Sequence, residues 1–293
     1  MESLNRMATE LVDEAIDFAP ELGIEIHSLQ GDAAVLDFGV ERPGAVEAGL
    51  LLAEIQTAGL ATVQTRMDEV AATPRTHGGW ELSTEGFEGL GSGPARALVA
   101  EEEIFQVIGY RDEFDFAVLA LEAERLPDEE VAATVAERAG VPESGVFLPT
   151  FSTASVTGSV VAAARAAELA AFRLHELGYD PLDILSATGS APVPPVAGDE
   201  ETAIARTTDA VAFGGQVHLV VDEPFDRFDE VVSTAREEYD SSFETIFGDV
   251  DWDFSELPVG LFGPAQVTVD VRGGETNTLG ALAPGRLAES FGL

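Results

Sequence analysis

The spacing of apolar residues alternates along the chain between the period of a helix and that of a strand. After Ser3, which can cap a helix, Leu4, Met7 and Leu11 begin a helical spacing that ends near Gly23. The same criterion next predicts strands at residues 24–29 and 33–40, a helix at 45–59, a strand at 61–67, a helix at 95–103, strands at 105–110 and 116–122, a helix at 128–140 and a strand at 146–149. Further along it predicts helices at residues 159–177, 200–207 and 230–247, and strands at 216–222 and 266–271.

The order of these elements favours an α+β fold. Strands and helices alternate, but hairpins and irregular glycine segments break the regular strand-helix rhythm of a doubly wound sheet. A chain of 293 residues is long enough for two lobes, which we place at residues 1–150 and 151–293, with a terminal segment able to cross between them.

The predicted helix at residues 159–177 is apolar on nearly all sides and carries two charged residues in one stripe. A rotation of 100° per residue places Arg165 and Glu168 beside Val161 and Phe172. Because burying a lone charge costs several kcal/mol, the two must pair or line a cavity. One interpretation is a structural ion pair, and the other is a carboxylate held for general base catalysis.

A glycine-rich segment leads into the predicted helix at residues 95–103. Gly91, Ser92 and Gly93 precede Pro94, so backbone N–H groups and Arg96 can face an anion there. The segment is no dinucleotide fingerprint, because Pro94 stands where a third glycine belongs, and no P-loop, because lysine is absent. A plain turn into a helix is the alternative.

A second loop candidate lies in the C-terminal half. Residues 188–196, which include Pro194, combine hydroxyl side chains with a stiff proline-rich backbone, and Arg206 and Asp209 follow. Such a segment can line a ligand, although most proline-rich connectors are structural.

Composition narrows the classes of function. The 54 acidic residues face 15 basic ones, all of them arginine, and give a net charge of −39. The carboxylates are spread over the whole length, which favours adaptation to molar salt over one acidic site for a cationic partner. The lack of a cationic surface argues against nucleic acid, and no apolar run is long enough to span a membrane.

The rarity of sulfur and imidazole ligands also restricts the chemistry. The chain has no cysteine, which excludes disulfides and thiolate metal sites, and its four histidines lack metal-ligand spacing. The residues therefore give little support to a metal mechanism, and since no export signal is recognised, we expect a cytoplasmic location.

Several ordered motifs lie at consistent spacing over nearly the whole chain. They are FGVERPGAVEAG (38–49), GSGPARAL (91–98), PTFSTASVTGS (149–159), RAAE (165–168), HELG (175–178), APVPPV (191–196), RTTDA (206–210) and GG (214–215). Together these motifs resemble those of the archaeal methenyltetrahydromethanopterin cyclohydrolases.

The resemblance implies a homotrimer whose two α+β lobes enclose a reduced pterin in a cleft. It implies reversible hydrolysis of the methenyl group to a formyl group, without a cofactor. Glu168 would activate water, and Arg165 would orient that carboxylate and tune its pKa. The expected substrate-binding residues are Ser92, Gly93, Arg96, Ser155, Ser159, Pro194, Arg206, Asp209 and His77.

Two departures from the family pattern bear on the choice of pterin. Glu101 to Glu103 stand where the family usually has lysines, and Arg75 to His77 lie in a shortened loop. The carrier can therefore be tetrahydromethanopterin or tetrahydrofolate. A non-catalytic protein that binds a reduced pterin in the same cleft is the competing function.

The charge balance generates a first prediction. Unscreened repulsion opposes compaction, so the melting temperature should be lower in about 0.1 M than in about 3 M salt, where the screening length falls to about 3 Å. Thermal unfolding followed by circular dichroism at both salt concentrations measures the effect. Equal melting temperatures would contradict it.

Overall fold

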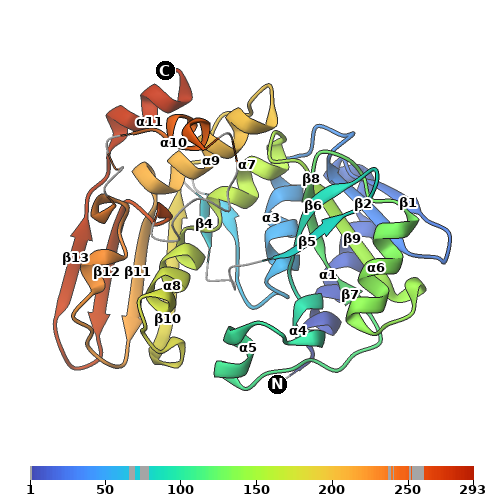
Figure 1. Ribbon diagram of the computed structural model, residues 1–293, viewed down its shortest axis with the longest axis horizontal. Helices are drawn as coiled ribbons and strands as arrows, with labels where there is room; N and C mark the ends of the chain where they lie inside the picture. The colour runs from blue at the N-terminus through green and yellow to red at the C-terminus, as the bar shows by residue number, and fades with distance from the viewer. Residues whose placement is uncertain are drawn as a thin grey trace. The chain divides into compact units, whose positions relative to one another are not determined.

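The computed structural model describes residues 2–65, 70–72, 79–236, 239, 241–250, 252 and 261–293, and it confirms the α+β class (Figure 1). The chain forms two compact units. The first unit comprises Met1–Thr62 and Gly78–Val161, and the second comprises Val63–His77 and Ala162–Leu293. The contacts within the chain place the division after Val161, whereas the sequence analysis placed it near residue 150. An internal segment, Val63–His77, belongs to the second unit.

The first unit is built on a mixed sheet, to which the described residues contribute seven strands. In spatial order they are β1 (Glu25–Ser28), β2 (Ala34–Gly39), β9 (Val146–Phe151), β8 (Ala120–Ala123), β6 (Glu88–Ser92) and β5 (Trp80–Ser83), with β7 (Ala117–Val118) also pairing with β9. Strands β2, β9 and β8 run parallel, and the β1–β2, β8–β6 and β6–β5 pairs are antiparallel.

Helices cover both faces of this sheet. They are α1 (Leu4–Asp17), α2 (Ala19–Leu22), α3 (Val46–Gln56), α4 (Ala95–Val99), α5 (Glu103–Ile108) and α6 (Glu129–Ala139), and a 3-10 turn, η1 (Glu143–Gly145), precedes β9. Successive residues of a strand point to opposite faces. Val35 packs in the core under α6, and Leu36 in the core under α1 and α3. Burial on both faces explains why the inner strands are apolar without alternation.

The second unit has a separate mixed sheet. Its described strands, in spatial order, are β13 (Thr276–Gly280), β12 (Gln266–Val271), β11 (Gln216–Val221), β10 (Ile184–Ala191), β4 (Val70–Ala72) and β3 (Gln64–Thr65). The remaining elements are α8 (Ala166–Glu176), α9 (Glu200–Gly214), α10 (Phe243–Asp249), α11 (Pro284–Phe291) and the 3-10 turns η2 (Pro181–Asp183), η3 (Phe228–Glu230) and η4 (Ser233–Ala235). Helix α8 packs on β10 and β11, while α10 and α11 pack against α9. Helix α7 (Val156–Ala163) begins in the first unit and ends in the second.

Four sequence predictions of secondary structure were wrong. The helix expected at residues 95–103 ends at Val99, because Ala100 adopts a left-handed conformation with φ of 53°. The strand expected at residues 105–110 is helix α5, in which only Phe105 is buried and which Gly109 ends with φ of 63°. Where a single helix was expected at 230–247, the described residues form the 3-10 turns η3 and η4 and then the separate helix α10. The helix expected at 159–177 is interrupted between α7 and α8. In each case the spacing of apolar residues fitted the predicted element. Local turns, which this spacing does not encode, determined where the helices begin and end.

No helix in the described ranges is long and apolar enough to cross a membrane.

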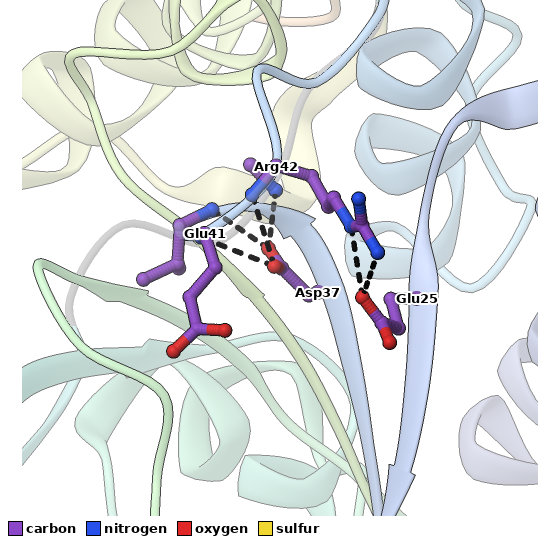
Figure 2. Close-up of polar contacts among 6 residues, drawn as sticks. Glu25, Asp37, Glu41 and Arg42 are labelled. Atoms are coloured by element: carbon purple, nitrogen blue, oxygen red, sulfur yellow. Dashed lines mark hydrogen bonds and ion pairs between the residues drawn. The ribbon is translucent and has the colours of Figure 1, made fainter.

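A buried carboxylate organises the turn that follows β2. Asp37 is fully buried, and its Oδ1 accepts hydrogen bonds from the N–H groups of Gly39 (3.0 Å) and Val40 (2.7 Å). Its Oδ2 accepts from the N–H groups of Glu41 and Arg42, both at 3.1 Å (Figure 2). The turn is thus held by one side chain with all four carboxylate bonds directed at backbone donors.

The turn is also fixed to the start of α7. Thr157 Oγ1 donates to the carbonyl oxygen of Phe38 at 2.5 Å, and Val156 N–H donates to Pro43 O at 3.2 Å. Gly44 adopts φ of 72°, and a Cβ there would lie 2.9 Å from Phe38 O and would overlap Thr157. Glycine is therefore required where this turn passes α7.

We expect Asp37→Asn to lower the free energy of unfolding by about 3 kcal/mol, because the amide NH₂ would face the N–H groups of Glu41 and Arg42. Denaturant unfolding in molar KCl measures the change. Glu41→Gln, whose exposed side chain lies in the same turn, is the control and should change stability by less than about 0.5 kcal/mol. Equal effects of the two substitutions would refute this role of Asp37.

Candidate functional site

Arg165 and Glu168 form an ion pair in the second unit. Arg165 Nε lies 3.3 Å from Glu168 Oε2, and its Nη2 lies 3.4 Å from Oε1. The Glu168 side chain is only 4% exposed, whereas that of Arg165 is 31% exposed. The pair therefore joins a desolvated carboxylate to a guanidinium that reaches solvent.

The break between α7 and α8 places this pair at a helix start. Arg165 is the residue before α8, and Glu168 lies in the first turn of that helix. A negative charge is favoured there by the exposed N–H groups and the helix dipole. The predicted continuous stripe through Val161 is therefore wrong, but the i,i+3 pairing of Arg165 with Glu168 survives the break.

Close packing against a strand fixes α8. A Cβ at Gly189 of β10 would lie 2.6 Å from the backbone nitrogen of Ala167, so only glycine permits this approach. Ala170 and Leu174 are fully buried on the same helix. The carboxylate of Glu168 thus projects from a helix with little freedom to move.

The glycine-rich segment lies in the first unit, at the end of β6. Ser92 Oγ accepts a hydrogen bond from Gln56 Nε2 at 3.0 Å. The Arg96 side chain is 1% exposed, and its Nε and Nη2 donate to the two carboxylate oxygens of Glu102 at 3.0 and 2.7 Å. This bidentate pair joins α4 to Glu102, the residue that precedes α5. Binding of substrate by Ser92, Gly93 and Arg96 stays a prediction.

Ser155 and Ser159 lie elsewhere in that unit. Ser155 precedes α7, and its Oγ accepts a hydrogen bond from Gly158 N–H at 2.9 Å, as a helix cap does. It follows the C-terminal end of β9, where Phe151 pairs with β2 and β8. Ser92 ends β6, which runs antiparallel to β8, so the glycine loop after Ser92 leaves the sheet at the opposite end of the strands. Ser92 and Gly93 are therefore separated from Ser155.

Arg206 and Asp209 lie in the second unit, in a pocket of about 270 Å³ between α9, α10 and α11. The residues that line it include neither Arg165 nor Glu168. Pro194 is buried in the segment after β10, and His77 lies outside the described residues. Contact of these residues with substrate stays a prediction.

Sequence reasoning missed two charged residues that lie beside these positions. Glu122 accepts a hydrogen bond from buried Thr153 beside the end of β9, and Arg286 lines the pocket that holds Arg206. Neither stands near a recognised motif, and only strand register or helix packing brings each to its partner. Among the described residues, no group of three or more His, Asp or Glu side chains is placed to hold a metal ion.

Burial of Asp209 has a consequence for stability. The side chain is 1% exposed, and burial raises its pKa, partly offset by hydrogen bonds from Ser290 and the Phe243 N–H. The folded chain therefore binds this proton more tightly than the unfolded chain, so stability present below the ordinary aspartate value is lost as pH rises through the raised pKa.

Asp209→Asn should therefore remove part of the loss of unfolding free energy as pH rises above about 4. Denaturant unfolding at fixed ionic strength between about pH 4 and pH 7 measures the slope. Asp13→Asn, an exposed aspartate on α1, is the control and should keep the slope of the wild-type chain. Parallel slopes for wild type and Asp209→Asn would contradict the prediction.

Comparison with known proteins agrees with the motif pattern. The chain matches the family described as Cyclohydrolase (MCH) over residues 3–77 and 75–291. It is 57% identical to the methenyltetrahydromethanopterin cyclohydrolase of Halobacterium salinarum over 310 aligned positions, covering all of both chains. It is 38% identical to the protein of the same name from Methanocella arvoryzae, covering all of this chain and 99% of that one. The chain therefore belongs to the methenyltetrahydromethanopterin cyclohydrolase family.

Proposed function

We propose that the chain catalyses the reversible hydrolysis of 5,10-methenyl-tetrahydromethanopterin to the formyl-tetrahydropterin. The observation that carries this proposal is the desolvated Glu168 carboxylate held beside Arg165 at the start of α8. Full-length relatives that bear the cyclohydrolase name support the choice of reaction.

The proposed substrate is a cation in which one carbon bridges two nitrogens. A water oxygen bonds to that carbon, and Glu168 accepts one proton of the water. The tetrahedral adduct then collapses: one C–N bond breaks, the hydroxyl oxygen becomes the formyl oxygen, and its proton moves to the released nitrogen. The proton on Glu168 passes to solvent, so one proton is released per turnover.

The two charged residues have different proposed roles. The carboxylate of Glu168 offsets the positive charge of the bound substrate as well as accepting the proton. Arg165 restricts the rotation of that carboxylate, because its Nε and Nη2 each face one carboxylate oxygen. A fixed carboxylate needs less reorganisation when water attacks.

The remaining parts of the proposal come from the family resemblance. They are a homotrimeric assembly, a cytoplasmic location, turnover without a cofactor, and a cleft between the two lobes as the binding place of the pterin. Tetrahydromethanopterin is the proposed carrier, because it is named in the relatives, including the haloarchaeal one.

Glu168→Gln should retain pterin binding and lose turnover by about 100-fold or more, since the amide cannot accept the proton. Loss of methenyl absorbance in molar KCl measures turnover, with methenyl-tetrahydromethanopterin and methenyl-tetrahydrofolate as parallel substrates. Glu176→Gln removes an equal charge from an exposed position on the same helix and should retain activity.

The outcomes separate the candidate functions. Turnover by the wild-type chain that collapses only in Glu168→Gln supports the proposal, and the faster substrate identifies the carrier. Near-normal turnover by Glu168→Gln would exclude Glu168 as the base. Binding of either pterin without turnover by a folded wild-type chain would favour the non-catalytic binding protein.

A further inference from the structure

The pocket between α9, α10 and α11 has a charged interior, and neither Arg165 nor Glu168 is among the residues that line it. Asp209 and Arg206 of α9 and Arg286 of α11 line it and are at least partly buried. Glu244 and Glu289 also line it but are exposed, so they belong to its rim. The interior thus holds two guanidinium groups and one carboxylate, in a chain with 54 acidic residues and 15 arginines.

The carboxylate in the pocket is committed to the protein. Asp209 Oδ1 accepts a hydrogen bond from the N–H of Phe243 at 3.1 Å, and the Ser290 side chain also bonds to it. These contacts tie α9 to the first residue of α10 and to α11. Asp209 therefore serves the packing of the three helices rather than neutralising Arg206.

Arg206 differs from many arginines of this chain in its partner. Arg96, Arg227 and Arg272, for example, each form an ion pair with a carboxylate. The Nε of Arg206 instead donates to the carbonyl oxygen of Ser290 at 3.2 Å. Within the described ranges, no ion pair and no other hydrogen bond engages the guanidinium of Arg206.

The second cation lies on the opposing helix. Arg286 Nη1 donates to the carbonyl oxygen of Tyr239 at 2.7 Å, and its guanidinium lies 4.9 Å from the centre of that ring. These contacts hold Arg286 in place while it lines the same pocket as Arg206. Two fixed guanidinium groups around one cavity are the arrangement that recognises phosphate or carboxylate groups.

We propose that this pocket is a binding site for a small oxyanion, phosphate or carboxylate, held by the Nη groups of Arg206 with Arg286 as the second cation. A volume of about 270 Å³ admits such a group together with a short organic portion. At molar salt the screening length of about 3 Å limits repulsion by the exposed Glu244 and Glu289. We therefore expect the site to bind its anion in molar salt, the condition that the acidic surface indicates.

Equilibrium dialysis of the full chain in molar KCl, with labelled inorganic phosphate and labelled succinate as separate probes, tests the site. One saturable site per chain is expected for at least one probe, and the tighter probe distinguishes phosphate from carboxylate recognition. Arg206→Gln and Arg286→Gln should each weaken binding by about tenfold or more. Arg272→Gln, an exposed arginine of the same unit, should bind as the wild type does.

Melting temperatures establish that each variant is folded. If Arg206→Gln does not fold, Arg206→Lys keeps the charge without the two-pronged geometry, and weakened binding by this variant supports the site. Absence of saturable binding of both probes by the wild type overturns the proposal. Equal binding by wild type, Arg206→Gln and Arg286→Gln also overturns it, because the anion then lies elsewhere.

Discussion

The buried Asp37 carboxylate is the constraint on which the first unit depends most. This one side chain accepts hydrogen bonds from four successive backbone N–H groups, at the end of β2 and in the turn that follows it. This turn contacts the start of α7 through Thr157, and a Cβ at Gly49 of α3 would lie 2.7 Å from Val160 of α7. The start of the helix that leads toward Arg165 is therefore set by a turn and by a close helix crossing.

In the second unit, close approach of two backbones likewise fixes the position of a helix. Gly189 lets α8 approach β10, and the buried Ala167 and Ala170 on that helix fill little space. Small residues keep the helix near its sheet, so a charged residue in its first turn is desolvated without a deep cavity. The Arg165 guanidinium then offsets the cost of burying the Glu168 carboxylate.

Arginine is scarce in this chain, and its contacts show where positive charge is used. Arg96 is buried against Glu102, and Arg138 lies over the buried Trp80 ring at 4.2 Å from its centre. Arg96 thus joins α4 to the start of α5, and Arg138 joins α6 to β5. A planar cation with several donors suits both contacts better than an ammonium group. The excess of carboxylates over arginines accounts for the pI of about 4.1. Most of these carboxylates lie at the surface, which suits a salt-rich solvent.

The sequence was sufficient to predict the α+β class, the elements with strong periodicity such as α6 and β9, and the i,i+3 proximity of Arg165 and Glu168, because these depend on local spacing. It also gave the family, since ordered motifs are a property of the chain. The three-dimensional structure was needed to show that α7 and α8 are separate helices and that residues 105–108 are helical. It alone showed that Arg96 pairs with Glu102 and that Arg286 joins Arg206 in one pocket. Those features depend on turns and on contacts between segments far apart in sequence, which apolar periodicity does not encode.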